Sequence, residues 1–395
     1  MFFSRQRLCW DSSIYIIFEA KSQLILLLWQ QIFINYVNMS SIKSLLLFSS
    51  LLFLVLGQTC LDHSGNAIDW WFILKMPTDP TFSARGMDYL YCDAKNNCGT
   101  FDWQTDQLDY LTSPLQRTMA QIDFHNDNVM SVLWSDQPWN KNTISDRAHS
   151  KGILSAGING SAFLISHSTP TFPMLDDAYD QIVLGMPSSA QVNGQHYMCL
   201  SITTTEANRL ATEYIIAETL TNRANSPAAF ATAFPQLYQL KSNSRTKTYK
   251  TESGTVLSSA LQDSIKISTK GGFTLTAYTK NEDLVEDFYA DVVAAALGKD
   301  LIMETWGNGT GGLQSAVCDQ TPKSYSNLVR QHGAFTFSYT KDHSKYGITA
   351  TSTNVCFCDL NRQTTQQKRG GVVYCFQHKS LWTFINQSFI SRQTC

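Results

Sequence analysis

Arg147-Ala-His149-Ser-Lys151-Gly152 and Lys341-Asp-His343-Ser-Lys345-Tyr346 are the two stretches that carry the most information about this chain. Both contain His-Ser-Lys, and the two histidines stand 194 residues apart. Side chains two residues apart on an extended strand point to the same side, so each stretch places an imidazole beside an ammonium group. The repeat predicts a pseudo-symmetric site to which each half of the chain contributes one histidine and one lysine.

These side chains suit chemistry on a phosphodiester. An imidazole can attack phosphorus or transfer a proton, and a lysine binds a non-bridging oxygen as a point charge. Eighteen residues after the two histidines stand His167 and Asn361, and both side chains can donate a hydrogen bond to a phosphate oxygen. For His167, a core histidine bonded to a carbonyl is an equally good interpretation.

Outward from these stretches, strands and helices mix without the regular βαβ rhythm of a Rossmann sheet or a barrel, which predicts a mixed α/β (α+β) fold. We expect strands over 69–77, 128–134, 151–156, 162–165, 196–202, 301–306, 336–339, 354–358 and 371–376. We expect helices over 206–220, 227–240, 284–297 and 379–389. The basic stretch 242–250 is interpreted as a solvated loop rather than a DNA-binding surface. The sequence contains no glycine-rich phosphate loop, HExxH motif or zinc-type CxxC pair.

The N-terminus indicates export. Residues 39–57 begin with a short basic segment, continue with a 12-residue apolar run and end at a small residue, Gly57. This layout is typical of a secretory signal peptide, and the run is too short to span a membrane comfortably. We therefore expect 1–38 to be an over-extended N-terminus, 39–57 to be the signal peptide and 58–395 to be the mature chain. A longer signal-anchor is the alternative.

The composition fits an exported protein. Ten cysteines point to an oxidising compartment, and a charged fraction of only 16% argues against disorder and coiled coil. The net charge of −2 gives no sign of a constitutive nucleic-acid binder. Without residues 1–57 the chain has 26 basic and 30 acidic residues, and all eight histidines remain. Their protonation at a pH of about 5 would reverse the sign of the net charge, which suits a polyanionic substrate in an acidic compartment.

Taken together, these residues resemble the deoxyribonuclease II family of the phospholipase D superfamily. The resemblance covers essentially the whole mature chain. It rests on the segments 60–71, 134–138, 149–152, 167–173, 294–298, 342–345, 359–362 and 369–371, and on Cys356 and Cys375. It implies a fold of two related halves, about 58–205 and 206–395, each a mixed sheet flanked by helices. It also implies an acid endonuclease that acts on DNA and is lysosomal or secreted.

The resemblance also implies the site. The expected catalytic residues are His149, Lys151, His343 and Lys345, and the expected phosphate-binding residues are Asn361 and His167. The implied reaction passes through a phosphohistidine without a metal ion and leaves 3′-phosphate and 5′-hydroxyl ends, with His149 as nucleophile and His343 as general acid. The chain departs from the expected pattern in two places. Residues 153–160 lack the usual superfamily carboxylate after the first His-x-Lys, and residues 366–368 replace the acidic residues expected before Arg369.

The cysteines and sequons complete the expectations. The resemblance implies the disulfides Cys60–Cys199, Cys318–Cys395 and Cys356–Cys375. The residues themselves indicate a local Cys92–Cys98 loop, which leaves over Cys358, and Cys358 could compete with Cys356 for Cys375. We expect glycosylation at Asn308 and Asn386 rather than at Asn159, where a glycan would crowd the site.

DNA is the expected partner, with no cofactor, no metal and no stable membrane anchor after signal cleavage; a homodimer is left open. Two alternatives also stay open. One is a catalytically weakened, secreted DNA-binding or toxin-like homologue, favoured by the missing carboxylate. The other is a phosphodiesterase that acts on RNA or phospholipid, since the same two histidines serve other phosphodiesters.

Overall fold

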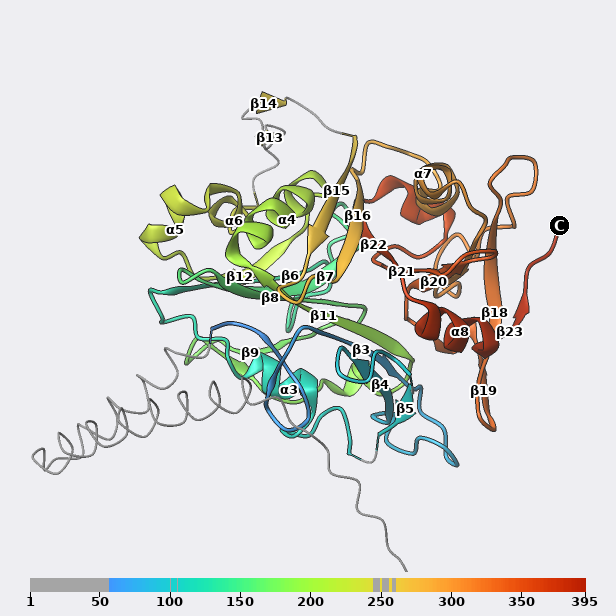
Figure 1. Ribbon diagram of the computed structural model, residues 1–395, viewed down its shortest axis with the longest axis horizontal. Coiled ribbons are helices and arrows are strands. Elements are labelled where there is room, and N and C mark those ends of the chain that lie inside the picture. Colours follow the sequence, from blue (N-terminus) through green and yellow to red (C-terminus); the bar gives the residue numbers. More distant parts are fainter. Residues whose placement is uncertain (1–56, 100, 105, 244–248, 251–255, 258–260) are drawn as a thin grey trace, which may run out of the picture. The chain divides into compact units, whose positions relative to one another are not determined.

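The computed structural model describes residues 57–99, 101–104, 106–243, 249–250, 256–257 and 261–395 (Figure 1). The predicted N-terminal extension and nearly all of the predicted signal peptide lie outside these residues, as does most of the basic stretch 242–250. Residues 57–395 cluster as one unit.

The first sheet contains eight of the described strands, in the order β12-β6-β7-β8-β11-β3-β4-β5, and every pairing is antiparallel. In chain order they are β3 (Trp70–Lys75), β4 (Tyr89–Asp93), β5 (Asp102–Trp103), β6 (Val129–Ser135), β7 (Lys151–Gly157), β8 (Ser161–His167), β11 (Gln195–Thr203) and β12 (Thr221–Ala224).

The second sheet contains nine of the described strands, in the order β15-β16-β22-β21-β20-β17-β18-β19, with β23 beside β18. In chain order they are β15 (Gln262–Ser268), β16 (Thr274–Lys280), β17 (Leu301–Glu304), β18 (Ser324–His332), β19 (Phe335–Ser338), β20 (Tyr346–Thr349), β21 (Asn354–Cys358), β22 (Gly371–Gln377) and β23 (Phe389–Arg392). Strands β17 and β18 are parallel, and the other pairs are antiparallel.

The two sheets repeat one topology, which confirms the expected pair of related halves. The strand order β6-β7-β8-β11-β3 of the first sheet has its counterpart in β17-β20-β21-β22-β16 of the second, with the strands in the same chain order. Each His-x-Lys stretch leads into the second strand of its series, β7 or β20. The sheets do not divide at the expected boundary near residue 205, because β12 returns to the edge of the first sheet after the helix α4 (Thr204–Ile216).

Alternating side chains pack the sheets face to face. On β3, Trp70, Phe72 and Leu74 belong to the core between the sheets, whereas Trp71 and Ile73 belong to a second core on the opposite face. Between the sheets the Phe72 ring stacks on Phe357 of β21 and Phe376 of β22, with ring centroids 5.1 Å apart in each case. Because strand side chains alternate, one strand supplies both cores.

The helices lie outside or at the joint of the sheets. Helix α4 packs on β7, β8 and β11 of the first sheet and on β15, β16 and β22 of the second, beside α5 (Ala228–Ala233) and α6 (Pro235–Gln239) (Figure 1). The remaining helices are α3 (Pro114–Met119), α7 (Ala295–Leu297) and α8 (Lys379–Ser388). Small two-stranded ladders pair β1 (Cys60–Leu61) with β2 (Ala67–Ile68), β9 (Met174–Asp176) with β10 (Gln181–Val183), and β13 (Tyr249–Lys250) with β14 (Val256–Leu257).

Two predicted helices were wrong in extent. The helix expected over 227–240 is broken at Phe234, because Pro235 lacks an N–H and disfavours the helical conformation of the residue before it. The helix expected over 284–297 begins only at Phe288, with a π-helical turn over Phe288–Ala294. Its N-cap, Asp287, accepts hydrogen bonds from the backbone N–H groups of Tyr289 and Ala290.

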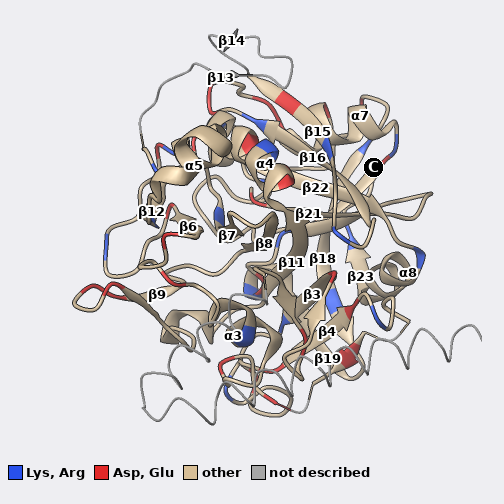
Figure 2. Cartoon of the chain, turned by 60° about the vertical axis from the view of Figure 1, so that its left-hand side comes forward, with Lys and Arg blue, Asp and Glu red and all other residues tan. Residues whose placement is uncertain are grey.

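The described part of the chain contains the disulfides Cys60–Cys199, Cys92–Cys98, Cys318–Cys395 and Cys356–Cys375. Cys358 is a buried free thiol. Charged side chains are sparse along the chain (Figure 2). Among the described residues, no helix is long and apolar enough to cross a bilayer.

Candidate active site

Each predicted histidine is anchored by the opposite half of the molecule. His149 and Lys151 lie where the chain enters β7, and the His149 backbone N–H donates to the Gly370 carbonyl, just before β22. His343 lies before β20, and its backbone N–H donates to the Gly194 carbonyl, just before β11. The N···O distances are 3.0 and 2.8 Å. These reciprocal bonds bring both His-x-Lys stretches to the junction of the two sheets.

A buried lysine in each half fixes the loop that provides this anchor. Lys75, at the end of β3, donates to the carbonyls of Met76, Gly86 and Gln191. Burial lowers the pKa of its ammonium group to about 7. Gln191 lies three residues before the anchoring Gly194.

The second half repeats this arrangement. Lys280, at the end of β16, donates to the carbonyls of Asn281, Leu284 and Gln367, and Gln367 lies three residues before Gly370. Burial lowers the Lys280 pKa to about 8. The sequence analysis singled out neither lysine, because their common role becomes visible only once the two sheets are aligned.

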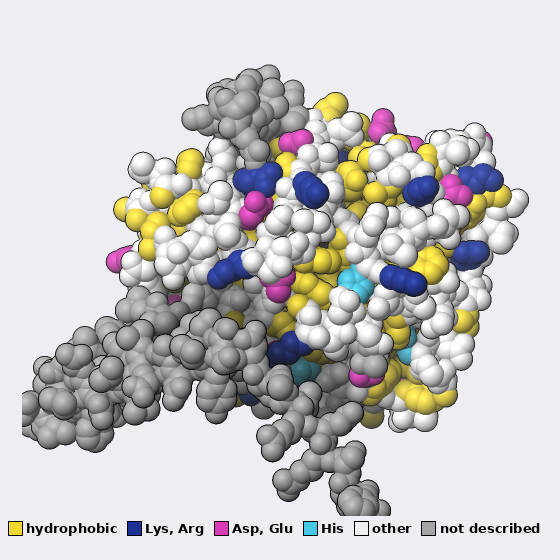
Figure 3. Space-filling view, in the orientation of Figure 1, with side chains coloured by type: hydrophobic (Ala, Val, Ile, Leu, Met, Phe, Trp, Pro, Cys, Tyr) yellow, Lys and Arg dark blue, Asp and Glu magenta, His cyan; other side chains and the backbone are white. Residues whose placement is uncertain are grey.

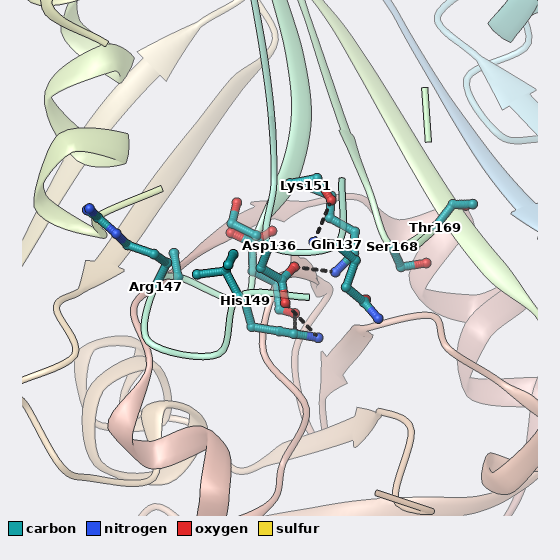
Figure 4. Close-up of polar contacts among 12 residues, drawn as sticks. Asp136, Gln137, Arg147, His149, Lys151, Ser168 and Thr169 are labelled. Atoms are coloured by element: carbon teal, nitrogen blue, oxygen red, sulfur yellow. Dashed lines mark hydrogen bonds and ion pairs between the residues drawn. The ribbon is translucent and has the colours of Figure 1, made fainter. Parts of the chain in front are cut away.

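Asp136, which the sequence analysis did not assign to the site, places a carboxylate beside the first His-x-Lys. One of its oxygens lies 2.6 Å from Lys151 Nζ, and the other lies 3.0 Å from Arg369 Nη2 and 4.0 Å from His149 Nε2 (Figure 4). Asp136 follows β6, whose last residue Ser135 pairs with Lys151 across the ladder. The carboxylate therefore comes from the neighbouring strand, and Asp136 stands within the 134–138 segment that carried the family resemblance.

The surroundings of His149 fix its tautomer. Its Nδ1 lies 2.9 Å from the Asp359 carbonyl oxygen. A carbonyl can only accept, so Nδ1 carries the proton and Nε2 holds the lone pair. Burial lowers the pKa of the imidazole well below its usual value, and the nearby charges of Lys151, Lys345 and Arg369 lower it further. Both effects favour the neutral form of the His149 imidazole.

His343 has a different neighbour. Its ring packs on Trp306 with centroids 4.5 Å apart and an interplanar angle of 53°. Burial and the charge of Lys345 lower the pKa of His343 to about 3. Lys345 donates from Nζ to the His343 carbonyl at 2.7 Å, and burial lowers its own pKa to about 7.

The two predicted phosphate-binding residues lie in this region. His167 is buried at the end of β8, and its Nδ1 accepts a hydrogen bond from the Thr169 N–H rather than donating to a carbonyl. Its Nε2 has no hydrogen-bond partner among the described residues. Asn361 follows β21; its Nδ2 donates to Gln363, and its Oδ1 likewise has no partner in the described part of the chain.

The sequence analysis placed His196 in a strand without assigning it to the site. Its Nδ1 accepts a hydrogen bond from the Lys345 backbone N–H at 2.9 Å, so Nε2 carries the proton. That Nε2–H is buried and unpartnered within the described residues. In the ladder of β11 and β8, its neighbour Tyr197 lies opposite His167. Only this strand pairing, which the sequence does not reveal, brings His196 and His167 together.

Metal-binding groups and the distribution of charge were compared over the described part of the molecule. Among the residues that the structure describes, no group of three or more His, Cys, Asp or Glu side chains is arranged to hold a metal ion. On the face drawn in Figure 3, Lys and Arg side chains are interspersed with Asp and Glu.

The sequence was compared with family models and curated proteins, and the structure with solved structures. A family model described as Deoxyribonuclease II matches residues 59–395. The "Cell-death-related nuclease 7" of Caenorhabditis elegans is 27% identical over 340 residues, which cover 85% of this chain and 88% of that protein. "Deoxyribonuclease-2-alpha" of Mus musculus is 28% identical over 361 residues, with 87% and 95% covered. A mutant of the yeast tyrosyl-DNA phosphodiesterase resembles the structure with a TM-score of 0.33 and 9% identity, covering 65% of this chain and 85% of that one.

Proposed function

This chain belongs to the deoxyribonuclease II family of DNA-degrading hydrolases, and on that premise we propose that it is a lysosomal or secreted acid endonuclease. It cleaves DNA without a metal ion, through a phosphohistidine, and leaves 3′-phosphate and 5′-hydroxyl ends. The observation that carries the proposal is the reciprocal anchoring of His149 and His343, each by a glycine carbonyl of the other half.

In the first step, Nε2 of His149 attacks phosphorus. A P–N bond forms, the P–O5′ bond breaks, and His343 gives its proton to the departing 5′ oxygen. His149 is assigned as nucleophile because the Asp359 carbonyl holds the proton on Nδ1 and leaves Nε2 its lone pair. The 3′ side of the DNA stays on His149 as a phosphohistidine.

In the second step, neutral His343 takes a proton from a water molecule that attacks the phosphohistidine. The P–N bond breaks, its electron pair returns to Nε2 of His149, and the DNA leaves with a 3′-phosphate. Both histidines are then in their starting states, so the cycle needs no oxidant, reductant or further reactant.

The negative charge of the transferring phosphoryl group is held by protein donors. Lys151 and Lys345 supply charge, and the Nε2–H groups of His167 and His196 and the Asn361 amide supply hydrogen bonds. These donors occupy the role that a divalent ion plays in metal-dependent nucleases. Asp136 lies beside Lys151, so the missing carboxylate no longer favours a weakened homologue.

Supercoiled plasmid incubated at a pH of about 5 with EDTA tests the proposal. The wild-type protein should nick and then linearise the plasmid, and His343→Ala should lower the rate by about 10²–10⁴-fold because the proton donor is lost. His125→Ala, which removes an exposed histidine, is the matched control and should cleave normally. Intact plasmid with the wild-type protein, full activity in His343→Ala, or 5′-phosphate ends would contradict the proposal.

A further inference from the structure

The ladders of the two sheets define which positions beside the histidines are equivalent. In the first sheet, Ser135 of β6 pairs with Lys151 of β7, and Asp136 is the next residue. Asp136 therefore occupies the first position after the strand residue that faces the lysine.

In the second sheet the same counting leads to an indole. Glu304 of β17 pairs with Tyr346 of β20, which places Thr305 opposite Lys345 and Trp306 next in the chain. Trp306 is thus the counterpart of Asp136. The two halves place different side chains at this position: a carboxylate beside His149, and an indole whose ring centroid lies 4.5 Å from that of His343 at an angle of 53°.

Both side chains are held in place. Asp136 is fixed by Lys151 and Arg369, so most of its charge is already compensated. Trp306 lies in a closely packed loop, where a Cβ added at Gly309 would come within 3.0 Å of its Cζ3 atom. The Gly309 backbone therefore packs close to the indole, which lies against the His343 ring.

We propose that Trp306 is a positioning residue that makes His343 the general acid, and that the exchange of Asp136 for Trp306 between the halves gives two otherwise equivalent histidines different roles. This inference rests on the proposed function and deepens it. The face of an indole attracts a cation, so it favours the protonated imidazole over the neutral one. A carboxylate at the same place would instead pair with Lys345, as Asp136 pairs with Lys151.

Most of the charges around His343 oppose the protonation of its imidazole. Three lysines act against its protonation: Lys345 on the same stretch, Lys151 from β7 and Lys75 from β3. The carboxylate of Asp342 favours protonation, but it is ion-paired with the buried Arg330 of β18. The indole and the bound phosphate then add to the support that Asp342 gives an imidazolium beside the leaving oxygen.

A substrate that does not need a general acid tests this role. We would compare single-turnover cleavage of two oligonucleotide duplexes, one with an ordinary phosphodiester and one with sulfur in place of the bridging 5′ oxygen at the same step. A 5′-thiolate leaves without protonation, because a thiol is several pKa units more acidic than an alcohol. Trp306→Leu should cleave the ordinary duplex about 10-fold more slowly than wild type, yet cleave the thio duplex at the wild-type rate.

Two variants and a pH profile complete the experiment. Trp306→Phe keeps an aromatic face and should recover most of the rate, whereas Trp103→Leu changes an exposed tryptophan and serves as the matched control. In Trp306→Leu the basic limb of the rate profile on the ordinary duplex should move to lower pH by about one unit, because the imidazolium loses its support.

The outcomes separate this inference from the proposed function. Equal slowing of Trp306→Leu on both duplexes, or no slowing on either, would overturn the positioning role. Failure of the proposed function shows itself elsewhere, in a wild-type protein that cuts neither duplex or a His343→Ala protein that is equally slow on both.

Discussion

At the scale of residues, the site depends on charges buried beneath the histidines. Asp136 stands between Lys151 and Arg369, and all three side chains are almost completely buried. A carboxylate in this place fixes the position of the Lys151 ammonium group and compensates two cations that would otherwise repel each other.

Asp136→Asn should therefore damage both activity and stability. We expect the single-turnover rate to fall by about 10²-fold, because Lys151 loses the partner that orients it. We expect the free energy of unfolding in urea to fall by about 2–4 kcal/mol, because two buried cations are left without a counter-charge. Asp109→Asn, which removes an exposed ion pair with Arg85, is the control and should cost less than about 1 kcal/mol. An Asp136→Asn protein as active and stable as the control would refute this reading.

The repeated His-x-Lys was visible in the sequence because it is a fixed spacing of residue types, and the structure brings both copies to the junction of the two sheets. Asp136 and His196 were not found in this way. Each belongs to the site through a neighbouring strand, Asp136 through β6 beside β7 and His196 through β11 beside β8. The places of Asp136 and His196 beside the histidines both depend on the strand order of the sheet, which a single sequence does not reveal.

At the scale of elements, strands with apolar runs were predicted well, and the expected strand over 354–358 coincides with β21. Strand β15 was missed because most of its side chains are exposed and polar, so it has no apolar run. Pro235, which divides α5 from α6, breaks the helical pattern around it because it has no backbone N–H.

Helix α4 carries a pH-dependent element at the joint of the two sheets. Burial raises the pKa of Glu213 to about 8, opposed in part by Thr279 of β16 and by Arg209. In the unfolded chain Glu213 ionises near pH 4.5, so between these values the folded state binds a proton that the unfolded state releases. This contribution to stability is complete below pH about 4.5 and is lost as the pH rises toward 8.

Glu213→Gln should therefore remove part of the pH dependence of stability. At a pH of about 5 its free energy of unfolding should be close to that of wild type, and at about 7.5 it should be higher by roughly 2 kcal/mol. Urea unfolding at the two pH values measures the difference. Asp102→Asn, which changes an exposed carboxylate on β5, is the control; a Glu213→Gln effect that did not change with pH would contradict the assignment.

At the scale of the whole molecule, both halves build the candidate site. The topology is duplicated, and a glycine carbonyl of each half accepts a hydrogen bond from the histidine of the other. Gly370 is a sensitive point, because a Cβ there would come within 1.9 Å of the Ala217 carbonyl oxygen. The clash is with backbone, so no side-chain rotation relieves it.

Gly370→Ala should displace the carbonyl that holds His149. We expect a loss of about 10²-fold in the rate of phosphohistidine formation, measured by rapid quench with labelled DNA. Gly99→Ala, in an exposed turn where the nearest atom to a new Cβ lies 3.1 Å away, is the control. Retention of the wild-type rate in Gly370→Ala would show that this anchor is dispensable.

The shared strand order of the two sheets also determines how a mutation can act on one histidine and leave the other unchanged. A dimer of identical chains carries every mutation twice, so a carboxylate gained beside one histidine would also appear beside the other. In this protein both sheets lie in one polypeptide, so positions 136 and 306 can mutate separately. The peptide link between the halves thus allows the surroundings of the two histidines to differ, which the two roles proposed for them require.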